Sequence, residues 1–528
     1  MTKRVGIFGW GVVAPRSPDI EAFERNLKRA TSWLEPFDGF GPSNFLVGRP
    51  DFDFSVYREW INERFEPRRY AQLESKMGNT VKYAVGAFIQ ALEQNPGIEV
   101  LLRDLGDEAH VYVGTGLGDF PLQYKLVQRY YCAQQKWNRF WCQDAHNPAL
   151  KEYRSASDSE KATLREKHGA PTDPDTIDPE ADGCTEIRDD WYAFWVDFSD
   201  GLKSYLKRSR EIEGEDIGND IDSGKGSVIR RKASARRKLN SEFGCPTEPW
   251  NAVDPNLLWN IPNIPAAQVS MLGHITGPAI APVAACAGFS VALKLAVDAI
   301  RSGQAKTAVI GTTDPEPHAL SVGAFYGARV LSHDGRVSKP FTGMRGTHVS
   351  GGACIWIVGD ADYMKAQGYE PVGLEILGIG ISSDADHIIT PSEEGPRFAI
   401  RKALVDAAIE PEDVATWDMH ATATPGDWSE LQNTLAVLPG SMAITARKGT
   451  FGHGMSVCGG WELTAQHLGF SKGELLPVNL VGDEIHDQIR PYYHRLVQGE
   501  AQPPRGDVAG KINMGVGGIN ACTICRRW

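Results

Sequence analysis

The chain of 528 residues is 42% hydrophobic and 23% charged, with a formal net charge of −12. This composition supports a packed core and excludes general disorder, and the acidic balance argues against a nucleic-acid-binding protein. No apolar run is long enough to span a bilayer, and the nine scattered cysteines predict neither a zinc site nor a disulfide framework. We therefore expect a cytoplasmic protein with several domains, or one large α/β body with insertions.

Short β-branched runs alternate with helical patterns along most of the chain. The first run, at 4–13, has no small-residue cleavage site after it, so it is interpreted as a buried strand and not as a signal peptide. The helical patterns at 76–95, 288–303 and 396–410 carry apolar residues at i, i+3 and i+4. This alternation predicts a layered α/β fold whose apolar strands are covered on both faces. Further strands are expected at 110–118, 307–313, 352–360, 372–383, 416–422 and 521–527.

The segment from about 120 to 250 breaks this alternation and is interpreted as an insertion. It contains an acidic stretch, an aromatic cluster and a basic run, RRKASARRK, at 230–238. A solvated surface is the simpler interpretation of such charge runs, although an exposed basic run could also receive an acidic carrier protein. The aromatic cluster is too apolar for water, so we expect it to pack against the body or a partner subunit. Its members are Trp191, Tyr192, Phe194, Trp195 and Phe198.

Cys286 lies in VAACAGFSVAL, between an apolar approach and the first turn of an expected helix. The free N–H groups and the dipole at a helix N-terminus stabilise a thiolate, so this position predicts a nucleophile with a lowered pKa. The alternative is a buried cysteine that packs beneath the helix.

Two histidines favour the nucleophile. His420 follows a buried strand in DMHATATPGD, and His453 lies in the glycine-rich stretch KGTFGHG, five residues after Lys448. The three glycines around Val516 in NMGVGGINA can turn backbone N–H groups toward an oxyanion. A cysteine and two histidines, each at a junction of an α/β fold, predict one assembled site.

These motifs resemble those of the β-ketoacyl-acyl-carrier-protein synthases, the elongating condensing enzymes of fatty-acid and polyketide assembly. The stretch Ala284-Ala285-Cys286 is similar to the family's cysteine turn, and HATAT at 420–424 is similar to its H-G-T-x-T motif. KGTFGH at 448–453 matches the K-x-x-x-G-H motif, and GVGGIN at 515–520 resembles the G-F-G-G-T-N loop. The resemblance covers about 1–118 and 255–528.

The resemblance implies a thiolase-like fold of two similar five-stranded halves in five α-β-α-β-α layers. The first half would span 1–360, with Cys286 and the insertion, and the second would span 361–528, with both histidines. The resemblance also implies a homodimer, or a heterodimer with a related subunit. Substrates would arrive on the phosphopantetheine of an acyl carrier protein or of CoA, and no metal or redox cofactor is expected.

The resemblance further implies roles for single residues. Cys286 would hold the acyl group as a thioester, while His420 and His453 would hold the enolate formed when a malonyl thioester loses CO₂. The backbone N–H groups of Cys286 and Val516 would stabilise the oxyanion, and Val516 replaces the family's gating phenylalanine, which should widen the acyl entrance. Thr422 and Thr424 would bind the phosphopantetheine arm, and the supporting residues would be Lys448, Glu462, Asp427 and Glu430.

Three alternatives to a ketosynthase stay open from the residues. The chain could be an acyltransferase on the same fold, which need not decarboxylate. A thiolase would need a second cysteine near the C-terminus, for which Cys522 is the candidate. A non-catalytic partner like the chain-length factors would lack the nucleophile, and Cys286 argues against that reading.

Overall fold

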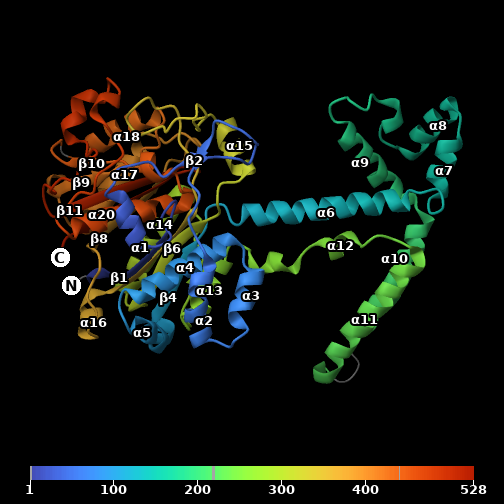
Figure 1. Cartoon of the computed structure of the whole chain (residues 1–528), viewed down its shortest axis with the longest axis horizontal. Helices are drawn as coiled ribbons and strands as arrows, with labels where there is room; N and C mark the ends of the chain where they lie inside the picture. Colours follow the sequence, from blue (N-terminus) through green and yellow to red (C-terminus); the bar gives the residue numbers. More distant parts are fainter. Residues whose placement is uncertain (1–2, 217–220, 439) are drawn as a thin grey trace. The chain divides into compact units, whose positions relative to one another are not determined.

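The computed structural model describes residues 3–216, 221–438 and 440–528 (Figure 1). It divides into two compact units: a body formed by 1–121 and 258–528, and a helical unit formed by 122–257. The helical unit occupies the segment interpreted as an insertion, and its last residue lies a few positions beyond the expected end at 250. No helix among the described residues combines the length and the apolar character needed to cross a bilayer.

The body is built on a ten-stranded sheet with the order β10-β9-β11-β12-β8-β1-β7-β6-β4-β5. The strands expected from β-branched runs are present, and the short β5 lies in the strand-like approach to Cys286, whereas β10 and β11 were not expected. Along β1, β4, β6 and β7 every residue is buried, as continuously apolar strands predict. The strands are β1 (Val5–Val13), β4 (Ala109–Gly114), β5 (Ala279–Ile280), β6 (Thr307–Asp314), β7 (Gly352–Asp360), β8 (Glu375–Ser383), β9 (Val414–Asp418), β10 (Ala443–Thr445), β11 (Val508–Gly515) and β12 (Ile519–Arg526).

The two halves of this sheet have the same strand order and the same strand directions. In the first half, β4 pairs in parallel with β5 and β6, while β7 pairs antiparallel with β6 and β1. In the second half, β9 pairs in parallel with β10 and β11, while β12 pairs antiparallel with β11 and β8. The halves join where Val5 of β1 pairs with Ile376 of β8. The structure thus repeats where the sequence shows no visible repeat.

Helices separate the two halves of the sheet and cover their outer faces. α14 (Gly288–Arg301) and α20 (Cys458–Phe470) pack against each other. α14 also packs on β4 and β6, and α20 packs on β9 and β11. α4 (Asn79–Glu93) and α13 (Ile264–Leu272) cover the first half, and α17 (Glu394–Ala407) covers β8 and β12. These are the five α-β-α-β-α layers of a thiolase-like fold. The other α-helices of the body are α1 (Ile20–Leu27), α2 (Arg58–Arg64), α3 (Arg69–Lys76), α5 (Ile98–Leu105), α15 (Ala319–Gly327), α16 (Ala361–Ala366), α18 (Gly426–Leu435) and α19 (Lys448–Phe451).

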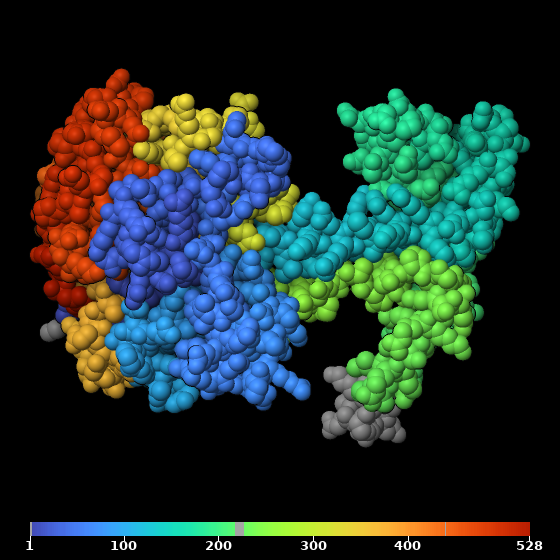
Figure 2. Space-filling view, in the orientation of Figure 1, coloured from blue at the N-terminus to red at the C-terminus, as the bar shows by residue number. Residues whose placement is uncertain are grey.

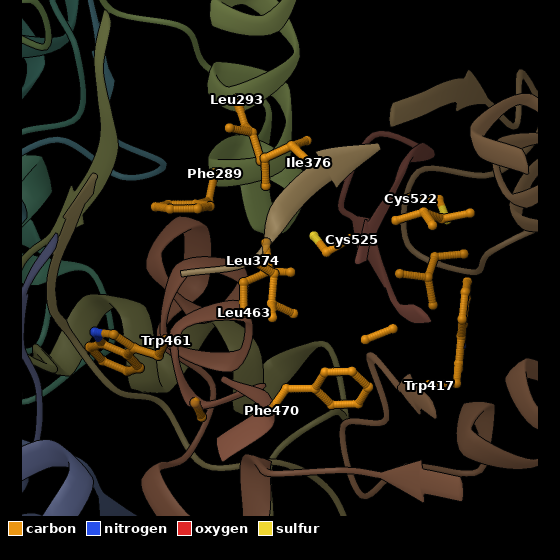
Figure 3. Close-up of a cluster of buried hydrophobic side chains, with 14 of the residues drawn as sticks. Phe289, Leu293, Leu374, Ile376, Trp417, Trp461, Leu463, Phe470, Cys522 and Cys525 are labelled. Carbon is orange, nitrogen blue, oxygen red and sulfur yellow. The ribbon is translucent and has the colours of Figure 1, made fainter. Parts of the chain in front are cut away.

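The largest hydrophobic cluster surrounds the two central helices (Figure 3). Phe289 and Leu293 of α14 are fully buried in it, as are Trp461 and Phe470 of α20. Burial of each such side chain contributes roughly 1.5–3 kcal/mol. Since α20 is buried along its whole length, its first residue is held firmly near the first turn of α14.

The helical unit has a hydrophobic core of its own, which corrects the expectation for the aromatic cluster. Trp191 and Trp195 are buried, and Tyr192, Phe194 and Phe198 pack partly buried against the same cluster. Every member of this cluster belongs to 122–257, so the aromatic side chains find their apolar partners inside the unit. The helices are α6 (Phe120–Trp141), α7 (Pro148–Ser155), α8 (Asp158–His168), α9 (Cys184–Trp195), α10 (Asp200–Glu213), α11 (Ile221–Phe243) and α12 (Pro249–Ala252).

The basic run at 230–238 lies on α11, whose surface is light green in Figure 2. The expectation of an exposed run holds for four of its six cations, whereas Lys232 and Arg236 are half-buried. Arg231 pairs with Glu215 at 2.7 Å, and Lys232 and Arg236 pair with Glu213. These ion pairs connect α11 to Glu213 of α10 and to Glu215, which follows that helix. The exposed cations that form no ion pair among the described residues are Arg230, Arg237 and Lys238.

Candidate active site

One cavity of about 190 Å³ brings together the residues that the sequence indicated. Cys286, His420 and His453 all line it, although they come from segments far apart in the chain. The remaining lining mixes apolar side chains with polar groups from α18 and the loop before it. It includes Phe325, Val330, Ile389, Met514, Val516, Thr422, Thr424, Asp427, Glu430 and Asn433.

Cys286 lies in a single 3₁₀ turn, Ala285–Ala287, directly before α14. The residue before it, Ala285, has a φ of 44°, a left-handed conformation that costs energy for any residue with a Cβ. Two further non-glycine residues with positive φ flank the histidine loops, Ala423 at 61° and Met455 at 53°. Strained backbone at three points around one cavity is typical of a functional site.

The expectation of a lowered thiol pKa at Cys286 is wrong. Burial raises the pKa of Cys286 to about 11, although the Lys448 ammonium and the backbone N–H groups of Val516 and Cys286 act in the opposite direction. The side chain is only 7% exposed. Loss of hydration destabilises the thiolate more than the helix terminus stabilises it.

His453 is positioned by backbone contacts on both sides. Its backbone N–H donates to the His348 carbonyl at 2.6 Å, and its carbonyl accepts from Ser350 at 2.9 Å. The ring Nδ1 accepts a hydrogen bond from the Met455 N–H at 3.1 Å. A neutral ring that accepts at Nδ1 carries its proton on Nε2. His453 therefore can donate from Nε2 to an oxygen in the cavity.

His420 reaches the same protonation state by another route. Its Nδ1 lies 3.5 Å from the Lys448 ammonium, which can only donate, so the ring proton belongs on Nε2. The two imidazole rings are nearly perpendicular, with centroids 5.4 Å apart. Burial and the Lys448 cation lower the pKa of both histidines well below the ordinary value, and Lys511 adds to this effect. Both rings are therefore neutral at physiological pH.

The glycine-rich loop after β11 lies directly against the cysteine turn. A Cβ built on Gly515 would lie 3.1 Å from the Ala284 carbonyl oxygen and 3.3 Å from the Cys286 nitrogen, so glycine permits the close approach. The Val516 N–H acts on the Cys286 sulfur, and the Val516 side chain is 42% exposed. Two backbone N–H groups, of Cys286 and Val516, thus lie beside the sulfur.

Two buried carboxyl groups of α18 hold the loop that carries His420. Glu430 accepts hydrogen bonds from the N–H groups of His420 at 2.6 Å and Ala421 at 2.7 Å. Asp427 accepts from Thr422 at 2.8 Å and from Phe341 at 3.1 Å. Burial raises the pKa of Asp427 to about 6, and burial with the nearby Asp427 raises that of Glu430 to about 8.

Thr422 and Thr424 face the same cavity from this loop. Their hydroxyl oxygens lie 2.9 Å apart and share a hydrogen bond. Each hydroxyl keeps further capacity for a ligand, since a threonine Oγ1 can donate once and accept twice. Asp427 and Glu430 thus order the loop, and Thr422 and Thr424 present its polar side chains to the cavity.

Lys448 and Glu462 form a buried ion pair behind the histidines, with Nζ 2.6 Å from Oε1. The Lys448 ammonium also donates to the His420 carbonyl oxygen. Although burial acts against the charged form, Glu462 raises the pKa of Lys448 above its ordinary value. The lysine therefore stays charged, and its ammonium group holds the His420 ring with Nδ1 toward it.

Three further charged residues lie beside this pair and were not expected from the sequence. Lys511 lies 2.9 Å from Glu462 and 3.1 Å from Asp418, and Arg447 lies 3.6 Å from Asp418. The signal was present, because a lysine in the apolar strand GKINMG and an aspartate at the end of ATWD are unusual for buried strands.

Asp314 at the end of β6 also lies near the cavity and was not expected there from the sequence. One carboxylate oxygen accepts from Thr115 Oγ1, the Gly116 N–H and the Leu117 N–H at 2.9–3.0 Å, and the other accepts from Ser456. This single buried carboxylate therefore ties the loop after β4 to the loop that follows His453.

Two other cysteines bear on the alternatives. Cys522 is buried in β12 and does not line the cavity. Cys458, the first residue of α20, is closer: its Sγ lies 3.0 Å from the Met455 carbonyl oxygen and 3.9 Å from that of Cys286. Burial raises the pKa of both thiols. Within residues 3–216, 221–438 and 440–528, no group of three His, Cys, Asp or Glu side chains could hold a metal ion.

Two segments of the chain match a known family. Residues 209–359 match the N-terminal domain of β-ketoacyl synthases, and residues 374–480 match the C-terminal domain. These segments contain Cys286, His420 and His453, whereas residues 1–208 and the GVGGIN loop lie outside them. The expected resemblance at 1–118 is thus not part of either match.

Curated relatives agree with this match. Nodulation protein E of Rhizobium sp. (strain N33) is 31% identical over 41% of this chain and 54% of its own length. The 3-oxoacyl-[acyl-carrier-protein] synthase 2 of Staphylococcus aureus (strain COL) is 28% identical over 51% of this chain and 66% of its own length. The chain spans between about half and two thirds of the length of these relatives.

Solved structures share the fold over the whole chain. A β-ketoacyl synthase from Burkholderia phymatum STM815 has a TM-score of 0.66 at 20% identity, and "the ishigamide ketosynthase/chain length factor" has 0.66 at 19%. A type II PKS acyl-carrier protein in complex with its ketosynthase has 0.61 at 17%. Each covers 100% of both chains.

The similar structures share a thiolase-like fold with this chain, and the matched domains are those of β-ketoacyl synthases. The chain belongs to the β-ketoacyl synthase family.

Proposed function

We propose that this protein is a β-ketoacyl synthase that condenses a malonyl thioester with an acyl group held on Cys286. The observation that carries the proposal is the single cavity in which Cys286 meets two neutral histidines, each with its proton on Nε2. One thiol can hold an acyl group, and two N–H donors can stabilise an enolate oxygen.

In the first half-reaction, the Cys286 sulfur attacks the carbonyl carbon of an acyl thioester. The sulfur–carbon bond forms, the carrier thiolate leaves, and the proton of Cys286 is returned to that carrier thiol. The N–H groups of Cys286 and Val516 stabilise the tetrahedral oxyanion. Neither histidine serves as the base, because each ring has its Nδ1 lone pair engaged and its Nε2 protonated.

In the second half-reaction, a malonyl thioester enters along Thr422 and Thr424. The bond to its carboxylate breaks, CO₂ leaves, and the electron pair forms an enolate whose oxygen accepts from His420 and His453. The enolate carbon then attacks the acyl-Cys286 carbonyl, and the Cys286 thiolate leaves and takes up a proton. This sequence uses no metal or redox cofactor.

We propose that the substrates are carried on phosphopantetheine of an acyl carrier protein or of CoA, in a fatty-acid or polyketide pathway. One relative is named for acyl-carrier-protein substrates and one similar structure is a complex with such a carrier, which supports this choice. A homodimer is proposed, or a heterodimer with a related subunit, as in the ketosynthase/chain length factor. The cytoplasmic location stays a prediction from the cysteines.

The alternatives are less well supported by the site. Cys522 does not line the cavity, which disfavours a thiolase that uses it. A chain-length-factor-like subunit has no use for a cysteine between two oxyanion N–H groups. An acyltransferase needs no pair of protonated Nε2 donors, and the decarboxylation assay separates it from a ketosynthase.

The test is CO₂ release from a malonyl thioester by wild type, Cys286→Ala, His420→Ala and His453→Ala. Cys286→Ala should lose condensation and keep decarboxylation. Each histidine variant should lose about 10²–10³-fold in decarboxylation, since one oxyanion donor is removed, and should still acylate Cys286. Normal decarboxylation by both histidine variants would show that the division of roles is wrong. Wild type that acylates and never releases CO₂ would be an acyltransferase.

A further inference from the structure

Five charged side chains form a buried network behind the histidines. Three are cations and two are anions, and their side chains are at most 2% exposed. Isolated charges are costly to bury, so such a network persists only when each charge has close partners. With three cations and two anions, the network buries one more positive charge than negative charges. Its members are Arg447, Lys448, Lys511, Asp418 and Glu462.

Glu462 is the central anion, because each of its two oxygens meets a different ammonium group. Oε1 lies 2.6 Å from Lys448, and Oε2 lies 2.9 Å from Lys511. The two lysines hold the pKa of Glu462 below its ordinary value although burial acts to raise it. Glu462 in turn fixes the ammonium of Lys448 that faces His420 Nδ1.

Lys511 has four oxygen neighbours. Besides Glu462 and Asp418, its ammonium donates to the backbone carbonyls of Met419 at 3.1 Å and Ile512 at 2.9 Å. Met419 directly precedes His420, so Lys511 contacts both the backbone before that histidine and the carboxylate that positions its lysine partner.

Resting on the proposed function, we propose that Lys511 is a positioning residue for the decarboxylation step: it holds Glu462 against Lys448 and the backbone before His420 in place. Through these contacts His420 keeps its Nδ1 toward Lys448 and its Nε2 proton toward the enolate oxygen. Lys511 does not itself touch the substrate.

The same cation helps to keep the histidines uncharged. Lys511 adds to the lowering of the pKa of His420 and His453 that burial and Lys448 cause. An imidazolium would gain a proton on Nδ1 and would lose the contacts described above. Every element packed around the two rings contributes charged or titratable groups. These groups are Arg447, which directly precedes α19, Lys448 of α19, Lys511 of β11, Asp418 of β9, Asp427 and Glu430 of α18, Cys458 and Glu462 of α20, and Cys286.

The experiment compares the pH profile of malonyl-thioester decarboxylation in wild type and in Lys511→Met. Methionine keeps the apolar stem and removes the charge. We expect kcat at pH 7 to fall about 10–100-fold with an unchanged KM, because a misplaced group loses rate and not binding. We also expect the fall in activity on the acid side of the profile to lie at a higher pH in the variant than in wild type, since removal of a cation raises the histidine pKa.

Asp418→Asn is the matched control. It breaks the same Lys511–Asp418 pair and also removes the carboxylate beside Arg447, so its structural cost is at least comparable, yet it removes an anion and leaves Lys511 on Glu462. In this variant the fall in activity on the acid side should not move to a higher pH. The double variant Lys511→Met with Asp418→Asn removes both charges of that pair and restores the net charge of the network, although Arg447 loses its carboxylate neighbour. It should melt at a higher temperature than Lys511→Met and still show the lowered kcat.

The outcomes separate the two proposals. Wild type without decarboxylation activity would remove the proposed function itself. Active wild type, with Lys511→Met showing the wild-type profile and kcat, would overturn the role of Lys511. The same conclusion would follow if the stabilised double variant recovered the wild-type rate, because Lys511 would then matter only for folding.

Discussion

At the residue scale, the unusual feature is a proposed nucleophile without a base beside it. The Cys286 thiol is buried and its pKa is raised to about 11. The two histidines that share its cavity use their Nδ1 lone pairs on Met455 and Lys448. Only the Lys448 charge and the nearby N–H groups favour the thiolate. In the proposed reaction, Cys286 would therefore act through a small thiolate fraction, and not through a thiolate–imidazolium pair.

The alkylation rate of Cys286 tests this protonation state. A thiol with a pKa of about 11 gains thiolate with every rise in pH below that value, so the rate constant with iodoacetamide should increase about tenfold per unit from pH 7 to 10. Mass spectrometry of the Cys286 peptide gives the rate separately from that of the exposed Cys132. A plateau already reached below pH 8 would mean that a histidine does pair with the thiol.

At the element scale, the sequence predicts those elements whose packing is decided by their own residues. Helix α14 was expected at 288–303 and spans Gly288–Arg301, because its apolar stripe faces the sheet. The three motif loops lie at strand or helix ends, and a layered α/β fold brings such ends together. Cys286, His420 and His453 could therefore be placed in one site from the sequence alone.

Other features depend on contacts between distant segments and could not be predicted. Strand β11 carries Lys511 in its middle, which hides its apolar pattern, and the lysine is tolerated only because β9 and α20 bring carboxylates to it. The thiol pKa of Cys286 depends on how much protein covers it. The partners of the aromatic residues on α9 come from α6, α7, α10 and α11.

Helix α11 offers a prediction about carrier recognition. Arg231, Lys232 and Arg236 are occupied by Glu213 and Glu215, so the remaining exposed cations are available to an acidic carrier. Replacement of Arg230, Arg237 and Lys238 by Ser should raise the apparent KM for carrier-bound substrate, more at low salt than at high salt. A small thioester mimic should be unaffected.

A variant with the same charge change elsewhere in the helical unit controls for net charge. Lys151, Lys167 and Lys207 are exposed and lie on other helices. Their replacement by Ser should leave the KM for carrier-bound substrate near that of wild type. If both triple variants behave alike over a range of salt, α11 is only a solvated surface.

At the scale of the whole molecule, the chain consists of two units with separate cores. The body holds every residue of the cavity, and the helical unit 122–257 holds its own aromatic cluster. Damage to one core should therefore leave the chemistry of the other unit intact.

Trp195→Ala tests this separation. Trp195 is fully buried, and its ring packs against Trp191, Tyr153 and Phe198. Its removal should cost about 3–5 kcal/mol of stability within the helical unit, seen by calorimetry as an earlier unfolding transition. Decarboxylation of malonyl thioester should stay near wild type, as in the control Trp250→Ala, whose side chain is half exposed. A matching loss of activity in Trp195→Ala would show that the two units are not independent.

The central claim is that Cys286 carries the acyl group, and the acyl-enzyme itself tests it most directly. Intact-protein mass spectrometry after incubation with a panel of acyl thioesters should show one acyl group per chain, on the Cys286 peptide, and none on Cys286→Ala. Alanine is nearly isosteric at this turn, so the variant should keep its fold. Acylation of Cys286→Ala at wild-type stoichiometry, or an acyl group found on Cys458 in the wild type, would contradict the assignment.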